Sequence, residues 1–119
     1  MIETKREPTE KKQPVATRLV IFLPGIGRST EKTIRVAAVT YEGKIDTTRD
    51  DTVELSINNE CLMHFTDSSK NVQLKLINGE ANATVISGQS LEVTIFKARW
   101  ISGKTPLQST QVTQVGIGH

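Results

Sequence analysis

Cys61 and His64 are the closest pair of side chains that could act in nucleophilic catalysis, as a thiol with an imidazole base. Side chains alternate between the two faces of a β-strand, so residues three apart point to opposite faces. The same alternation groups Cys61 with Met63 and Phe65, an apolar set. We therefore predict that Cys61 is buried as a small apolar side chain and that His64 faces solvent. His119, the terminal residue, adds no site.

Three acidic residues, Asp46, Asp50 and Asp51, gather in one short connection and offer the oxygen ligands that Ca²⁺ prefers. Their spacing differs from that of an EF-hand loop, and Arg49 lies inside the cluster. Asp is also an ordinary turn residue. We therefore favour a solvated turn, and a cation site at these three residues remains the alternative.

Trp100 and Tyr41 have the chemistry of a platform on which sugar rings stack. The chain has only five aromatic residues, which are Phe22, Tyr41, Phe65, Phe96 and Trp100. A fold with so few aromatic residues needs most of them in its core. Since a large indole is usually mostly buried, we expect Trp100 to belong to the core.

Two short motifs complete the candidate chemistry. Asn82-Ala83-Thr84 is an N-glycosylation sequon, and strand alternation places Asn82 outward. The segment Gly25-Ile26-Gly27 lacks the following Gly, Lys and helix of a phosphate-binding loop, so we interpret it as a turn. The sequence therefore assigns no catalytic, cofactor-binding or metal-binding residue and predicts that the protein is not an enzyme.

The elements that would position these residues are strands. Val, Ile and Thr supply 36 of the 119 residues, an excess typical of strands. From Arg18 onward, short runs with alternating or continuous apolar residues are separated by turn residues, and no run has a helical period. About eight such runs at intervals of roughly 8–12 residues predict an all-β sandwich. They lie near residues 19–23, 34–38, 53–57, 61–65, 72–76, 81–85, 91–100 and 108–115.

Three more specific signals accompany these runs. Asn78-Gly79 predicts a type I′ turn that joins the runs on either side of it into a hairpin. The apolar phase shifts by one residue between Ile95 and Phe96, which predicts a β-bulge there. The run Gln108–Val115 is rich in Gln and Thr and weakly patterned, which suits a last strand on an exposed edge.

The composition excludes several classes of function. Lys and Arg number 15 against 13 Asp and Glu, and the small basic excess falls within the first 18 residues. A nucleic-acid-binding domain normally carries a clustered basic face, so we expect no nucleic-acid partner. The longest apolar run, Leu19–Leu23, is far shorter than the roughly 18 residues of a membrane span. A single Cys excludes an internal disulfide framework and a Cys-rich zinc site.

The segment Met1–Thr17 differs from the rest in being charged, proline-containing and poor in apolar residues. Such a segment buries too little apolar surface to offset its ordering entropy. We predict a disordered leader or linker at residues 1–17 and a folded domain at residues 18–119. The segment lacks the apolar stretch of a signal peptide. Either the protein is intracellular, or the chain is an excised domain whose location would then be extracellular or at the cell surface.

Three segments in this order resemble the bacterial and archaeal immunoglobulin-like repeats of the invasin and intimin type. They are Ile34–Asp46, Arg49–Leu55 and Val72–Val85, within a likeness that extends from about Arg18 to Ile101. Such repeats commonly have an Asp three residues before the turn Gly, where this chain has Thr40. The resemblance implies an immunoglobulin-like Greek-key sandwich that serves as a spacer, stalk or binding module, without catalysis or cofactor.

These observations favour a non-enzymatic interaction or spacer module of a larger surface or extracellular assembly. Its partner would be a protein or a neighbouring domain, bound by strand pairing at an open edge such as Gln108–Val115. Two alternatives stay open. One is a carbohydrate-binding or accessory domain of a glycosidase. The other is a complete intracellular or virion structural protein.

Overall fold

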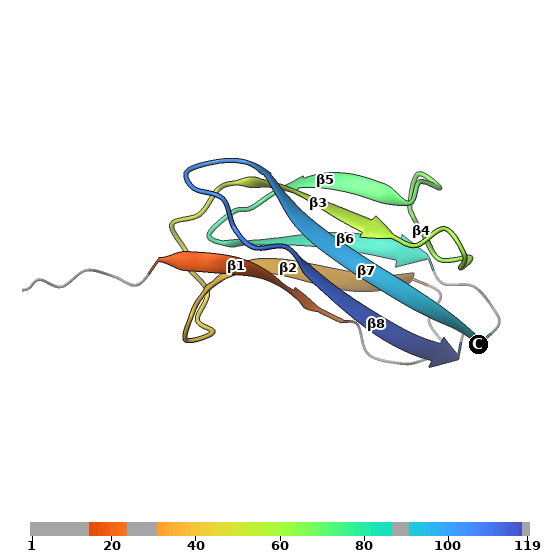
Figure 1. Ribbon diagram of the computed structural model, residues 1–119. Coiled ribbons are helices and arrows are strands. Elements are labelled where there is room, and N and C mark those ends of the chain that lie inside the picture. Colours follow the sequence, from red (N-terminus) through yellow and green to blue (C-terminus); the bar gives the residue numbers. More distant parts are fainter. Residues whose placement is uncertain (1–14, 24–30, 87–90, 118–119) are drawn as a thin grey trace, which may run out of the picture.

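The computed structural model describes residues 15–23, 31–86 and 91–117, and these form two packed layers of β-strands (Figure 1). Each layer is a sheet of four strands, ordered β1-β2-β6-β4 in the first and β5-β3-β7-β8 in the second. The strands are β1 (Ala16–Phe22), β2 (Glu31–Thr40), β3 (Thr52–Ile57), β4 (His64–Phe65), β5 (Asn71–Lys75), β6 (Glu80–Ile86), β7 (Leu91–Ser102) and β8 (Thr110–Ile117). Within these ranges there is no helix, and so none long and apolar enough to cross a membrane.

Neighbours within each sheet are mostly not neighbours in the sequence. In the first sheet β2 pairs antiparallel with both β1 and β6, and in the second β3 pairs antiparallel with both β5 and β7. The chain therefore passes repeatedly between the layers, as in a Greek-key sandwich. The predicted all-β, immunoglobulin-like sandwich of about eight antiparallel strands is confirmed.

The core lies between the two sheets and is built by alternation along each strand. In β3, Val53, Leu55 and Ile57 are buried, while the residues between them are half-buried on the other face. Phe96 of β7 is the largest of the fully buried side chains. Burial of one such side chain contributes about 1.5–3 kcal/mol, which makes the apolar interface the main source of stability.

The folded domain begins slightly earlier than the sequence predicts. Strand β1 starts at Ala16, two residues before the expected boundary at Arg18, and Ala16 is buried. The predicted leader falls mostly on residues 1–14, which lie outside the described residues, and it remains a prediction. The Gly25-Ile26-Gly27 turn and His119 also lie outside them.

The Asn78-Gly79 turn is present, but the predicted hairpin is wrong. Asn78 and Gly79 have φ of 53° and 85°, as a type I′ turn requires. Ile77 N donates to Glu80 O at 2.8 Å, and Glu80 N donates to Ile77 O at 3.2 Å. Beyond this single bridge the two arms separate, because β5 pairs with β3 in one sheet and β6 pairs with β2 in the other. The turn thus crosses between the layers.

The β-bulge predicted near Ile95 and Phe96 is also misplaced. The pairing of β7 with β8 continues without a shift along the whole of β8. The irregularity lies at the other end of β7, where one step along β3 matches two along β7 and leaves Ile101 as the extra residue. The pattern of apolar residues in the sequence shifts here because Val93 is 51% exposed while Thr94 is buried. A threonine therefore occupies the core position, and the backbone of the strand continues without a bulge.

Candidate functional site

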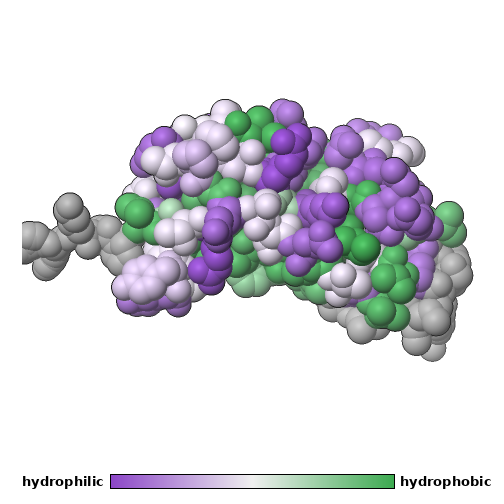
Figure 2. All heavy atoms as spheres, viewed as in Figure 1, coloured by the Kyte–Doolittle hydropathy of each residue, from purple (hydrophilic) through white to green (hydrophobic). Residues whose placement is uncertain are grey.

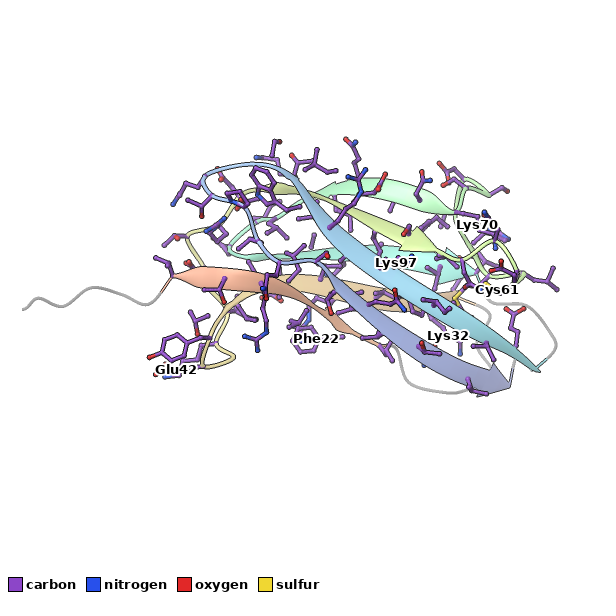
Figure 3. All side chains as sticks on the ribbon, in the orientation of Figure 1. Phe22, Lys32, Glu42, Cys61, Lys70 and Lys97 are labelled. Carbon is purple, nitrogen blue, oxygen red and sulfur yellow. The ribbon has the colours of Figure 1, made fainter. Side chains whose placement is uncertain are left out.

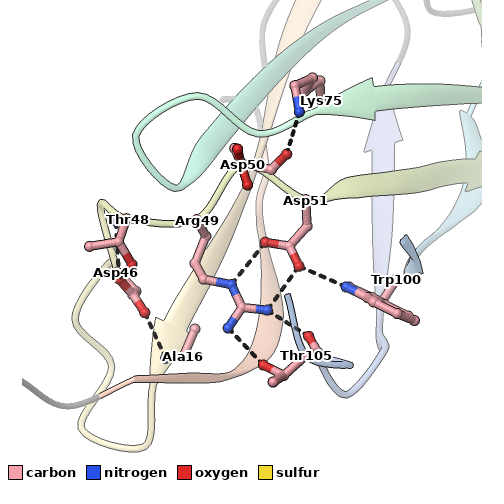
Figure 4. A network of polar contacts seen from close by, with 9 residues as sticks. All are labelled: Ala16, Asp46, Thr48, Arg49, Asp50, Asp51, Lys75, Trp100 and Thr105. Atoms are coloured by element: carbon pink, nitrogen blue, oxygen red, sulfur yellow. Dashed lines mark hydrogen bonds and ion pairs between the residues drawn. The ribbon is translucent and has the colours of Figure 1, made fainter. Parts of the chain in front are cut away.

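The connection between β2 and β3 contains a buried ion pair. The side chains of Arg49 and Asp51 are 2% and 0% exposed (Figure 4). Arg49 Nε donates to Asp51 Oδ1 and Arg49 Nη2 donates to Asp51 Oδ2, both at 2.8 Å. Two parallel bonds between a guanidinium and a carboxylate are stronger and more directional than neutral hydrogen bonds. The pair therefore fixes the shape of this connection.

The same pair reaches across to the second sheet. Trp100 Nε1, on β7, donates to Asp51 Oδ2 at 2.8 Å. Arg49 Nη1 donates to Thr105 Oγ1 at 3.0 Å, and Nη2 donates to Thr105 O at 2.6 Å. Thr105 lies in the loop between β7 and β8. These bonds join the β2–β3 connection, β7 and the following loop into one network (Figure 4).

Gly103 allows this loop to approach the ion pair. Its φ is 152°, and a Cβ atom added there would overlap the Asp51 side chain, with Oδ2 only 2.1 Å away. Any larger residue would have to displace the carboxylate. Gly103 directly follows β7, and the absence of a side chain there makes room for the network.

Asp46 links the connection to the first strand. Its Oδ2 accepts a hydrogen bond from Ala16 N at 3.0 Å, and its Oδ1 accepts bonds from Thr48 N at 3.1 Å and Thr48 Oγ1 at 2.7 Å. A carboxylate that bonds to the backbone two residues later forms an Asx turn. This turn fixes the point at which the chain enters β1.

The Asn78-Gly79 turn packs against the same connection. Gly79 N donates to Arg49 O at 3.0 Å. A Cβ atom at Gly79 would lie 2.4 Å from the carbonyl oxygen of Asp46. The requirement for glycine therefore has two causes, the positive φ of the turn and its contact with the connection.

Electrostatics within the network favour the charged forms. Hydrogen bonds from Arg49 are the main reason that the pKa of Asp51 is lowered, and they outweigh the cost of burial. The hydrogen bond with Asp51 raises the pKa of Arg49. Burial alone would raise the pKa of Asp46, but bonds from Thr48 and Ala16 and the charge of Arg49 lower it. Both carboxylates are therefore held in the ionised form, in which they accept hydrogen bonds and carry no proton to donate.

The predicted solvated turn at Asp46, Asp50 and Asp51 is wrong for two of its three members. Asp46 and Asp51 are buried, and each carboxylate is occupied by protein donors. Asp50 is exposed, and its backbone carbonyl accepts a bond from Lys75 Nζ at 2.7 Å. The alternative of a cation site finds no support either, since no three His, Cys, Asp or Glu side chains in the described ranges are grouped to hold a metal ion.

Cys61 is buried together with Met63 and Phe65, as the alternation predicts. Lys70 lies beside it (Figure 3), and its ammonium group donates to Met63 O at 2.6 Å and lies 3.8 Å from Cys61 Sγ. His64, predicted to face solvent, is half-buried, and its Nδ1 lies 2.7 Å from Phe65 O. These contacts hold the bend before β4.

The aromatic residues divide between the core and the surface. Phe65 and Phe96 are buried, and Trp100 is half-buried against the core, close to what the sequence predicts. Tyr41 is 74% exposed in the turn that follows β2. Since Tyr41 follows a strand of the first sheet and Trp100 lies in the second, they belong to different layers. Asn82 of the sequon is exposed on β6, as predicted.

A shallow polar groove on the outer side of the second sheet was not predicted. It crosses β3, β7 and the start of β8, and Lys97 lies on it (Figure 3). Arg99 Nε and Glu54 Oε1 form an ion pair across it at 2.7 Å. Its lining residues are Glu54, Ser56, Lys97, Ala98, Arg99, Ser109, Thr110 and Gln111. The alternating runs predict that the polar side chains among these residues face outward. They do not predict that these side chains lie together, because that depends on how the strands pair.

The solved structures that this fold resembles include glycosidases. A β-glucuronidase from Parabacteroides merdae has a TM-score of 0.61 and 9% identity, over 97% of this chain and 14% of that one. A family 2 glycosyl hydrolase from Bacteroides cellulosilyticus has a TM-score of 0.63 and 16% identity, over 85% of this chain and 14% of that one. A family 2 β-glucuronidase has a TM-score of 0.63 and 17% identity, over 90% and 12% of the two chains.

These likenesses establish the β-sandwich fold, and the chain spans only 14% of the length of the first two neighbours. No known protein family matches the sequence, and no curated protein does. The resemblance to invasin and intimin repeats therefore remains a prediction.

Proposed function

We propose that this chain is a non-catalytic accessory domain of a glycosidase, a β-sandwich that supports or positions a separate catalytic unit. One observation carries the proposal. The sandwich matches a small part of several much larger glycosidases, over 97%, 85% and 90% of its own length. A spacer or interaction role in a larger assembly, expected from the sequence, is compatible with such a domain.

The chemistry of the described residues supports a structural role. Glycoside hydrolysis generally needs two carboxyl groups at one sugar, one of which is kept protonated by a raised pKa. Here the buried carboxylates Asp46 and Asp51 have lowered pKa values and accept hydrogen bonds from the protein itself. They are therefore suited to holding loops in place.

The carbohydrate-binding form of this idea is less well supported. It requires an exposed aromatic platform, yet Trp100 packs against the core with its N–H group bonded to Asp51. The polar groove on the second sheet offers amide, hydroxyl and charged groups without an aromatic side chain. We therefore propose that the domain supports the catalytic unit, and we assign no sugar ligand to it.

The test begins with the reading frame on both sides of residues 1 and 119. We expect a glycosidase catalytic domain in the same protein, and the longest protein encoded is then assayed with nitrophenyl glycosides, with and without residues 15–117. The 119-residue chain alone is expected to give no hydrolysis above buffer, and the deletion is expected to lower the melting temperature or the activity of the enzyme. Hydrolysis by the chain alone, or a protein without a catalytic domain, would overturn the proposal.

A further inference from the structure

Asn78-Gly79 is the one place in the sequence where glycine directly follows asparagine. Asparagine is thermolabile, and its side-chain amide is lost most readily when the next residue has no side chain to hinder attack by its backbone nitrogen. In that reaction Gly79 N loses its proton to solvent and forms a bond with Asn78 Cγ. The bond from Cγ to Nδ2 breaks, and this nitrogen takes up a proton and leaves as ammonia. Water then opens the imide ring to aspartate or isoaspartate.

The side chain of Asn78 is accessible to this chemistry. Asn78 is exposed, and its turn lies at the end of the sandwich where β6 begins (Figure 1). Polar and apolar side chains share the surface at that end (Figure 2). Water, the co-reactant, therefore reaches the side chain, and the reactivity of the pair is decided at the backbone nitrogen of Gly79.

The conformation of the turn opposes ring closure. The imide ring contains Cα, Cβ and Cγ of Asn78 and the nitrogen of Gly79, so Cβ and that nitrogen must be eclipsed about the Cα–C bond. Asn78 has a φ of 53°, and the first central residue of a type I′ turn has a ψ of about 30°, which places the two atoms on nearly opposite sides of this bond. The backbone bonds between Ile77 and Glu80 hold that conformation.

The nitrogen of Gly79 is also occupied and shielded. It donates to Arg49 O at 3.0 Å, and Gly79 is buried. The nitrogen attacks only after losing its proton, and a buried N–H group bonded to a carbonyl does not meet a base in the solvent until the structure opens locally. Arg49 is in turn held by bonds from its side chain to Asp51 and Thr105.

We propose that Asn78 is a site of spontaneous deamidation and that docking of its turn on the β2–β3 connection controls the reaction. While Gly79 N is bonded to Arg49 O, the amide of Asn78 is stable. Once the turn leaves the connection, ring closure proceeds with water as the only co-reactant. The extent of modification therefore records how much of the time the turn has been undocked.

The first test compares the folded and unfolded 119-residue chain at the same temperature and neutral pH, in buffer and in guanidinium chloride. Trypsin cleavage after Lys75 and Lys97 gives a peptide that contains both Asn78 and Asn82, and mass spectrometry follows each amide. We expect Asn78 to react in denaturant and at least about 100-fold more slowly in buffer. Asn82, followed by Ala83, is the internal control and is expected to react far more slowly than Asn78 in denaturant. Equal rates at Asn78 in the two solutions, or an intact Asn78 in denaturant, would overturn the proposal.

Two variants separate undocking of the turn from unfolding of the domain. Asp51→Asn removes the counter-ion that holds Arg49 and is expected to speed the reaction of Asn78 in buffer about tenfold or more. Leu55→Ala is the matched control, because it empties a fully buried core position and leaves the contact between Arg49 and Gly79 in place. It is expected to react nearly as slowly as the unmodified chain while circular dichroism shows it folded. Equal acceleration in both variants would mean that unfolding of the whole domain controls the reaction, against the proposal.

Hydrogen exchange at the Gly79 amide of the unmodified chain depends on no variant. The bond to Arg49 O must break before either reaction, so we expect this amide to be slowed in the folded chain by a factor similar to that for deamidation. Fast exchange of the Gly79 amide together with slow deamidation of Asn78 would show that this bond is not the barrier, and the proposal would fail.

The products provide a further check. Isoaspartate adds an atom to the main chain of the turn, so the turn cannot keep both its own bonds and its bond to Arg49 O. Asn78→Asp introduces the same carboxyl group without the extra atom, and aspartate tolerates the positive φ. We expect Asn78→Asp to unfold at nearly the same denaturant concentration as the unmodified chain, and the chain with isoaspartate to unfold at a lower one. Equal midpoints for the two products would contradict the docking of the turn as the controlling contact.

Discussion

At the scale of single residues, the buried pair of Arg49 and Asp51 dominates the polar chemistry of the domain. Burial of two charges costs several kcal/mol per ion, and the pair offsets this cost only when hydrogen bonds satisfy both partners. Here the guanidinium donates to Asp51 and Thr105, and the carboxylate also accepts the N–H of Trp100. The pair is therefore satisfied on both sides and acts as a clamp between loops.

Asp51→Asn is expected to destabilise the domain by about 3–5 kcal/mol at neutral pH, because it leaves Arg49 charged and buried without its counter-ion. The pKa of Asp51 lies below its ordinary value of 3.8, so the unfolded chain takes up the proton first as the pH falls. Its contribution is therefore complete above 3.8 and is lost as the pH falls through the lower folded pKa. Urea unfolding at a series of pH values measures both effects.

Asp50→Asn is the control, since this carboxylate is exposed and only its backbone carbonyl is bonded. Its effect is expected to stay within about 0.5 kcal/mol. Equal losses in the two variants, or an unchanged acid dependence in Asp51→Asn, would show that the pair does not stabilise the fold.

The sequence does not reveal this clamp, and the reason is physical. Burial of one face of a strand places apolar residues at every second position. This pattern correctly predicted that Cys61 and Phe65 are buried. A connection has no such period, so the burial of Arg49 and Asp51 leaves no pattern in it. Their partners, Trp100 and Thr105, lie about 50 residues further along the chain and become neighbours only through the fold.

At the scale of elements, strands and turns were predictable and their partners were not. Alternation of apolar residues predicted β2, β3 and β7, because it reflects which face of a strand is buried. The Asn78-Gly79 turn was also predictable, since positive φ is a property of the residues themselves. Which strand pairs with which depends on distant segments, and the predicted hairpin failed for that reason.

Gly79→Ala and Gly43→Ala separate two reasons for a glycine in a turn, which are the positive φ and the lack of space for a Cβ atom. Both residues have positive φ, of 85° and 90°, but a Cβ at Gly43 meets nothing within 4 Å while one at Gly79 would lie 2.4 Å from Asp46 O. Gly43→Ala is expected to cost about 1–2 kcal/mol in backbone strain. Gly79→Ala is expected to cost about 1–3 kcal/mol more, through overlap with the connection.

Chemical denaturation of the two variants tests this expectation. Similar losses at both positions would mean that the turn moves away from Asp46 without cost. A larger loss at Gly43 would contradict the docking of the Asn78-Gly79 turn against the β2–β3 connection.

At the scale of the whole molecule, the clamp and the core belong to one folding unit. Trp100 packs against the core and also bonds to Asp51, so its surroundings depend on both sheets and on the loops. We expect urea unfolding followed by Trp100 fluorescence to coincide with unfolding followed by circular dichroism, as in a two-state transition. A fluorescence change at lower urea than the circular dichroism change would mean that the clamp opens before the sandwich does.

The positions of the terminal strands also determine how the domain would respond to tension. Strand β1 begins at one end of the sandwich and β8 finishes at the opposite end (Figure 1). A pull on the two ends of the chain would draw each strand lengthwise past its neighbour, loading all of its ladder bonds together instead of peeling them one at a time. The hydrogen bond from Ala16 N to the Asp46 carboxylate would bear the first part of that load.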